Sequence, residues 1–232
     1  MLVRVGEEVQ ALPRGLTGRL GALAAVAGIA LAGCGSDSSK TGACPTCPGV
    51  VAQTRADTYA AVARRTYRQE VFGDAGGSAF SHISSLPGLR QGLATGDYAL
   101  ARAALRDQPV RHAVRARVTR GSRVLVDVGL DFVIAGNPRP LVAGGGRPLG
   151  QLEISIQDVI GFVKLVHRLT GTQVVVRGSY AHHAESSLPA ALGPALPAKG
   201  PVTVGGRRYV ASSFARPGFG GEQLSVWILA PA

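Results

Sequence analysis

The spacing of apolar residues changes about halfway along the chain, and this change limits what the chain can fold into. Before it, apolar residues such as Leu100 and Ala104 recur four positions apart, which is typical of one face of a helix. After it, Val114, Ala116 and Val118 alternate with polar residues, and this period of two is typical of a half-buried strand. Helices followed by strands predict an α+β domain.

The helical part predicts one long helix and two shorter segments. Thr54 or Asp57 can cap the long helix, and Gly73 provides its stop. A weaker helical spacing follows and is interrupted by Pro87, whereas Asp97 caps a further short helix. These helices are expected to cover a sheet formed by the rest of the chain.

The second part predicts strands around one amphipathic helix. That helix is capped by Asp158 and stopped by Gly171, with Ile160 and Leu169 on its inward face, and residues 136–148 are predicted to form a loop. Strands are predicted at residues 110–118, 124–134, 149–156, 174–176, 202–204, 208–212 and 224–229. Short connections favour antiparallel neighbours, so we predict one antiparallel sheet of five to six strands, with a long N-terminal helix and helices packed on one face.

An uncharged apolar segment at residues 20–33 follows Arg14 and Arg19, as in a signal peptide. It is shorter than the roughly 20 apolar residues that a transmembrane helix needs. The residues before Cys34 resemble the lipobox of bacterial lipoproteins, which implies cleavage before Cys34 and lipidation of its thiol. The alternatives are an ordinary signal peptide or a buried helix that happens to end in cysteine.

This interpretation divides the chain into a signal peptide (1–33), a lipidated cysteine with a flexible tether (34–53) and one folded domain (54–232). Cys44 and Cys47 lie in the tether, where we expect them to form a small disulfide loop. A redox pair is the alternative, but no strand precedes it as in thioredoxin-like proteins. Zinc would need a second ligand pair.

The formal net charge is +11, carried mainly by arginine. On an exported protein, this charge favours contact with anionic lipid headgroups or wall polymers. No aromatic-interleaved basic stripe indicates nucleic-acid binding. The glycines at 144–146 lack the spacing of a phosphate loop, and no serine lies in a nucleophile-elbow pattern. We therefore expect neither a cofactor nor an enzymatic activity.

Four side chains are candidates for binding a ligand. Asp127 and Asp131 flank an apolar strand and could anchor a cationic group, although Asp127 could instead pair with an arginine across the hairpin. Arg177 and Tyr180 follow the fourth strand and could bind a carboxylate at a pocket rim, or could form only surface contacts.

Two adjacent histidines, His182 and His183, precede Glu185 in a loop rich in proline and alanine. Imidazole and carboxylate groups are zinc ligands. Adjacent side chains usually point apart, however, and no distant third ligand is evident from the sequence. We therefore expect no metal site here.

The order of elements, and residues 149–183 in particular, resembles the Cache family of bacterial extracytoplasmic sensors, whose fold is PAS-like. Residues 150–158 look like the family's strand entering a helix, residues 163–171 like that helix, and residues 172–176 like the next strand. The resemblance implies a small-molecule pocket between the sheet and the helix-bearing loops. The amino-acid-binding motif of the double-Cache receptors has no counterpart in the sequence, so no ligand class carries over.

These observations together predict a lipoprotein anchored to the cell membrane on its extracytoplasmic face. We expect its Cache-like domain to bind or sense a small solute, with any signal passing to a separate membrane protein because no signalling segment follows the last strand. The alternative is a basic lipoprotein that binds anionic wall polymer or a partner membrane protein without a small ligand.

Overall fold

The computed structural model of the chain describes residues 48–106 and 113–232. The predicted signal peptide, the lipidation site Cys34 and the predicted disulfide between Cys44 and Cys47 lie outside the described residues. Among the residues described, no helix is both long enough and apolar enough to cross a membrane.

The first helix is longer than the sequence predicted. It begins at Pro48, so the last residues assigned to the tether are helical, and it ends before Gly73 as expected. Asp97 caps the fourth helix, where its Oδ1 accepts a hydrogen bond from the backbone N–H of Leu100 at 3.0 Å. The helices of this region are α1 (Pro48–Phe72), α2 (Asp74–Ser84), α3 (Pro87–Thr95) and α4 (Tyr98–Arg106).

A four-stranded antiparallel sheet follows, in the order β2-β1-β4-β3. Its strands are β1 (Arg115–Arg120), β2 (Arg123–Gly129), β3 (Arg139–Val142) and β4 (Pro148–Ser155). The prediction of a loop over residues 136–148 is wrong, because β3 lies inside it. Leu141 is the buried residue of this short strand, so the sequence lacks the alternation that would indicate a strand.

The second sheet has five antiparallel strands in the order β6-β5-β9-β8-β7. They are β5 (Gln173–Gly178), β6 (Ala184–Ser186), β7 (Lys199–Val204), β8 (Arg207–Pro217) and β9 (Gln223–Pro231). Val174, Val175 and Val176 are fully buried, because helices cover one face of β5 and the segment after β6 covers the other.

The α+β fold class with a long N-terminal helix is confirmed, but the strands form two sheets rather than one. The second predicted strand ends at Gly129, which has φ +129°. The segment after Gly129 leaves the first sheet and forms two isolated bridges, Val133 to Asp158 and Ile134 to Gly218, before the chain returns to that sheet as β3. Alternating patterns specify strands without specifying their partners, so the division into two sheets was not visible in the sequence.

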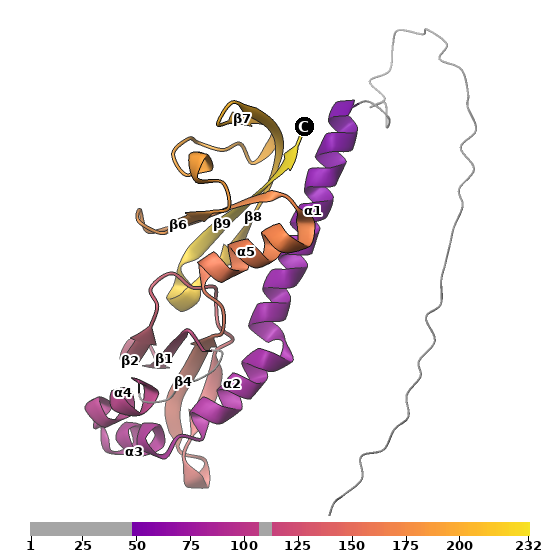
Figure 1. The fold of residues 1–232 in the computed structure, drawn as a ribbon. Helices are drawn as coiled ribbons and strands as arrows, with labels where there is room; N and C mark the ends of the chain where they lie inside the picture. The colour runs from indigo at the N-terminus through magenta and orange to yellow at the C-terminus, as the bar shows by residue number, and fades with distance from the viewer. Residues whose placement is uncertain (1–47, 107–112) are drawn as a thin grey trace, which may run out of the picture. The chain divides into compact units, whose positions relative to one another are not determined.

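α1 packs along strands β8 and β9 of the second sheet (Figure 1). Ala56, Ala60 and Ala63 are fully buried, and the lack of long side chains lets the helix approach β8 and β9 closely. Helices α2, α3 and α4 bury a separate apolar cluster against the first sheet. Each sheet therefore has its own core.

α5 (Val159–Thr170) is bounded as the sequence predicted. The carboxylate of Asp158 accepts a hydrogen bond from the backbone N–H of Gly161 at 2.8 Å, and Gly171 ends the helix in the left-handed conformation with φ +68°. The prediction that Ile160 and Leu169 face inward is wrong, because both are exposed. The buried face is narrower than the apolar pattern suggested.

Candidate functional site

A pocket of about 820 Å³ lies between the C-terminal part of α1, the first sheet and the turn between β8 and β9. We call it the central pocket. Its volume is in the range of small-molecule sites. Three guanidinium groups line it, and a single carboxylate accompanies them. The ionisable side chains of the lining are Tyr67, Arg68, Arg117, Glu153 and Arg216.

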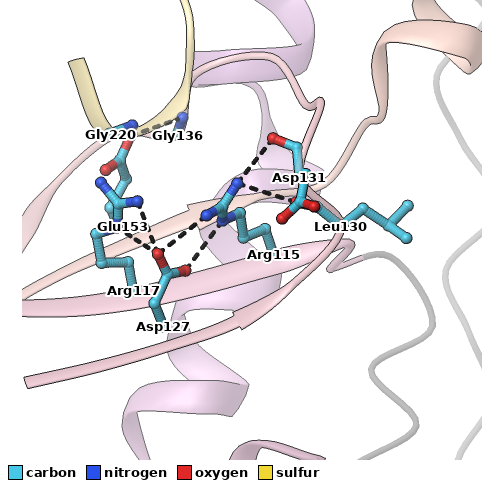
Figure 2. Close-up of polar contacts among 8 residues, drawn as sticks. All are labelled: Arg115, Arg117, Asp127, Leu130, Asp131, Gly136, Glu153 and Gly220. Atoms are coloured by element: carbon cyan, nitrogen blue, oxygen red, sulfur yellow. Dashed lines mark hydrogen bonds and ion pairs between the residues drawn. The ribbon is translucent and has the colours of Figure 1, made fainter. Parts of the chain in front are cut away.

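Glu153 projects from β4 and is held by the backbone of two other segments (Figure 2). Its Oε1 accepts hydrogen bonds from the N–H groups of Gly136 and Gly220, at 3.3 Å and 3.4 Å. Burial raises the pKa of this carboxyl, and the two N–H groups and the charge of Arg117 offset the rise only in part. Glu153 therefore gains a proton more readily than an exposed glutamate does.

Asp127 is shared by two arginines of the neighbouring strand (Figure 2). Arg115 donates to both of its carboxylate oxygens at 2.9 Å and 3.0 Å, and Arg117 donates to Oδ2 at 2.9 Å and 2.7 Å. Burial alone would raise the pKa of Asp127, but the hydrogen bonds and charges of the two arginines hold it below its ordinary value. The alternative of cross-strand pairing for Asp127 is thus the arrangement found.

The turn between β8 and β9 packs onto these arginines. The ring of Phe219 lies 5.1 Å from the guanidinium carbon of Arg115 and 5.2 Å from that of Arg117. Gly220 has φ +65°, and a Cβ there would lie 1.8 Å from Nη1 of Arg117. The positive φ favours glycine, and a side chain here would also displace the Arg117 guanidinium where the turn of the second sheet contacts the first.

Tyr67 and Arg216 form the wall of the central pocket opposite the first sheet. The Tyr67 hydroxyl donates to the carbonyl of Pro217 and accepts from the N–H of Ala135, and burial raises its pKa to about 12. Arg216 lies over the Tyr67 ring, at 5.9 Å from its centroid. The Arg216 Nε–H is buried and has no hydrogen-bond partner among the described residues, so a residue of the pocket lining carries an unused donor.

The predicted ligand-binding residues do not converge on one cavity. Asp131 and Tyr180 line a second, smaller pocket of about 330 Å³. Arg177 instead donates from Nη2 to three backbone carbonyls, those of Ala191, Leu192 and Pro194, at 2.7–3.1 Å. It fixes the loop after β6 and is not in the lining of either pocket.

His183 is buried and pairs with a carboxylate that the sequence analysis did not connect to it. Its Nδ1 lies 2.8 Å from Oε1 of Glu222, which precedes β9. Within the described part of the chain, no group of three histidine, cysteine, aspartate or glutamate side chains could hold a metal ion.

Glu153, Arg216 and Tyr67 were not among the site residues predicted from the sequence. Tyr67 follows the inward spacing of the first helix, so its burial was readable, but its hydrogen bonds join segments about 70 and 150 residues away. Glu153 is the only charged residue of β4, and this was the signal that could have found it.

The chain has structural matches among solved protein domains, each with a low TM-score and low sequence identity. It matches the periplasmic domain of Vibrio cholerae LuxQ with a TM-score of 0.42 and 10% identity, over 79% of this chain and 100% of that one. It also matches the ligand-binding domain of the Pseudomonas aeruginosa amino acid chemoreceptor PctB, in complex with L-Arg, with a TM-score of 0.37 and 12% identity over 77% and 94%. A third match is the ligand-binding domain of the P. aeruginosa amino acid chemoreceptor PctC, in complex with GABA, with a TM-score of 0.26 and 14% identity over 68% and 97%.

No protein-family model matches the chain, and no curated protein matches its sequence. At the identities of the structural matches, no ligand-contacting residue of those proteins carries over to this chain. The chemistry of the pockets therefore has to come from the residues that line them.

Proposed function

We propose that this protein is a lipid-anchored extracytoplasmic binding protein whose central pocket holds a small organic anion. The proposal includes no catalytic step. Any signal would pass to a separate membrane protein that recognises the ligand-bound domain. The observation that carries it is the excess of guanidinium groups around a pocket of about 820 Å³.

Charge and hydrogen bonding in the pocket favour an anion. Arg68 and Arg216 contribute positive charge, Arg117 is bound to Asp127, and Glu153 is the one carboxylate of the lining. Because burial raises the Glu153 pKa, its negative charge is held less firmly than that of an exposed carboxylate. The unused Nε–H of Arg216 would gain a partner from a ligand carboxylate or phosphate, and such charge-assisted hydrogen bonds are stronger than neutral ones.

The experiment is a thermal-shift screen of mono- and dicarboxylates and small phosphate esters against the folded domain. A ligand present at 100 times its dissociation constant should stabilise the domain by about 2.7 kcal/mol. For a domain of this size, that corresponds to a rise in Tm of roughly 5–11 °C. Arg216→Gln should weaken binding of the same ligand at least tenfold. Arg65→Gln is the matched control, because Arg65 lies on the exposed face of α1 and is not in the pocket lining.

Two outcomes would contradict the proposal. One is that no small anion raises Tm. The other is that only polyanions bind, with an affinity that falls steeply with salt and is equal in the two arginine variants. That second outcome would favour the alternative of a basic envelope protein that binds wall polymer.

The anchor is tested separately in cells. Metabolic labelling with palmitate should mark the full chain, and Cys34→Ser should abolish the label. Cys47→Ser is the control and should remain labelled. A full chain that takes up no label would refute the anchor without affecting the ligand proposal.

A further inference from the structure

The second pocket is chemically distinct from the central pocket, although the two adjoin. Arg117 and Gly220 appear in the lining of both, so the turn between β8 and β9 forms the wall between them. Its volume of about 330 Å³ suits a small molecule or one end of a larger one. We call it the His183 pocket.

His183 has a buried ring nitrogen without a hydrogen-bond partner among the described residues. The residue is only 6% exposed, and the nitrogen without a partner is Nε2. Glu222, itself 4% exposed, faces the other ring nitrogen at 2.8 Å. In the tautomer whose Nδ1–H donates to the Glu222 carboxylate, Nε2 is a hydrogen-bond acceptor. A buried polar atom without a partner is unfavourable, and a ligand N–H would satisfy it.

The charges around the His183 pocket favour a cation. Arg115 and Arg117 belong to its lining, but both are bound to Asp127 and packed against Phe219. Together with Asp127, the carboxylates of Asp131 and Glu222 leave one formal negative charge in excess when the imidazoles are neutral. In residues 48–106 and 113–232, the Asp131 carboxylate forms no ion pair. This local excess of acid lies in a chain with a net charge of +11.

Aromatic rings add a second element that favours cations. The Tyr180 side chain is 56% exposed, and its ring lies 6.4 Å from that of His182 and nearly parallel to it. The same Tyr180 ring meets His183 edge-on at 5.3 Å. Tyr180 lines the same pocket as the Asp131 carboxylate, whose charge also acts on Arg115, and an exposed aromatic ring attracts organic cations through its face.

We propose that the His183 pocket binds a small organic cation with N–H groups, of the alkylammonium or guanidinium class. Asp131 would pair with its charge, Nε2 of His183 would accept one of its N–H groups, and Tyr180 would cover it. This site is independent of the anion proposed for the central pocket, and either can fail without the other.

The test is calorimetry of the folded domain with methylguanidinium and with ethylammonium chloride. Sodium chloride at the same ionic strength serves as the salt control. At least one of the two cations should bind, and tetramethylammonium, which has no N–H group, should bind at least tenfold more weakly. Chemical shifts of the His183 imidazole, measured by NMR during the same titration, should move with the fraction bound.

Variants on the rim keep the test separate from folding. Asp131→Asn and Tyr180→Ala change exposed side chains, and each should weaken cation binding at least tenfold while leaving Tm nearly unchanged. Asp74→Asn removes an exposed carboxylate on α2 and should leave cation binding unchanged. Arg216→Gln should also leave it unchanged, because Arg216 lines only the central pocket of the two.

The proposal is overturned if neither cation binds, or if the Asp131 and Tyr180 variants bind as well as the original chain. It is also overturned if tetramethylammonium binds equally well. If oxalate or phosphate shifts the His183 signals while the cations do not, the pocket selects anions and the assigned charge preference is wrong.

Discussion

Replacing Asp127 with asparagine should destabilise the domain, because this one carboxylate is the partner of two partly buried guanidinium groups. The side chains of Arg115, Arg117 and Asp127 are 15%, 18% and 23% exposed. Asparagine keeps the size and one acceptor oxygen, so the change removes the charge and leaves little cavity. Removing one partner of a fully buried ion pair costs about 3–5 kcal/mol. Since Asp127 retains some contact with water, we expect a loss of about 2–3 kcal/mol.

The assay is thermal or urea unfolding followed by circular dichroism. A loss of this size lowers Tm by roughly 4–12 °C in a domain of 150–250 residues. Asp57→Asn is the matched control, since Asp57 pairs with Lys199 at 2.8 Å between side chains that are 40% and 63% exposed. Exposed ion pairs of this kind contribute about 0–1 kcal/mol.

The destabilisation by Asp127→Asn should also depend on pH in a defined direction. The folded-state pKa of Asp127 lies below its ordinary value of 3.8. A depressed pKa stabilises the fold above the unfolded-state pKa, and this stabilisation is lost as pH falls through the folded-state pKa. The free energy of unfolding of the original chain should therefore exceed that of the variant by its largest amount near pH 7, and the difference should become smaller below about pH 4. Equal stability near pH 7, or a difference that widens in acid, would refute the role assigned to Asp127.

Two further variants test the join between the sheets. Glu153→Gln should stabilise the domain more near pH 7 than near pH 4, because the raised folded-state pKa makes the ionised carboxylate unfavourable as pH rises through it. Unfolding measured at both pH values checks this, and a stabilisation found only at the acidic pH would contradict it. Gly220→Ala should lower stability by at least about 1 kcal/mol more than Gly221→Ala, because both glycines have positive φ but only a Cβ at Gly220 collides with Arg117. In a double-mutant cycle, the loss of stability caused by Gly220→Ala should be smaller when Asp127 is asparagine. A purely additive result would mean that the new Cβ does not act through the ion pair of Arg117 with Asp127.

Local signals in the sequence were sufficient for most elements of the fold. Asp97 and Asp158 cap helices as predicted, and Gly171 ends one, because these effects depend on residues within one turn of the helix. The hairpin of β1 and β2 also follows from alternation around a short turn. The sequence did not indicate which distant strands pair, and for this reason we predicted one sheet where the structure has two.

The candidate site was predicted only in fragments for the same reason. Asp131 and Tyr180 do share a pocket, yet the residues that give this pocket its character, His183 and Glu222, are 39 positions apart. Arg177 carries the right charge for a ligand contact but is occupied by carbonyls of its own loop. The residue types in the sequence suggested which side chains could bind a ligand, whereas the tertiary contacts determine which of those side chains are available to do so.

The packing of α1 against β8 and β9 has a consequence for how the domain acquires its structure. The buried alanines of α1 meet strands that are made some 150 residues later, as the hydrogen bond from Gln53 to the carbonyl of Ala211 illustrates. Contacts of such long sequence separation slow folding, because a large loop must close before they form. A chain that lacks β9 would leave the apolar face of α1 uncovered. We therefore expect such truncated chains to aggregate or be degraded. We also expect α1 to pack against the second sheet only when synthesis of the chain is nearly complete.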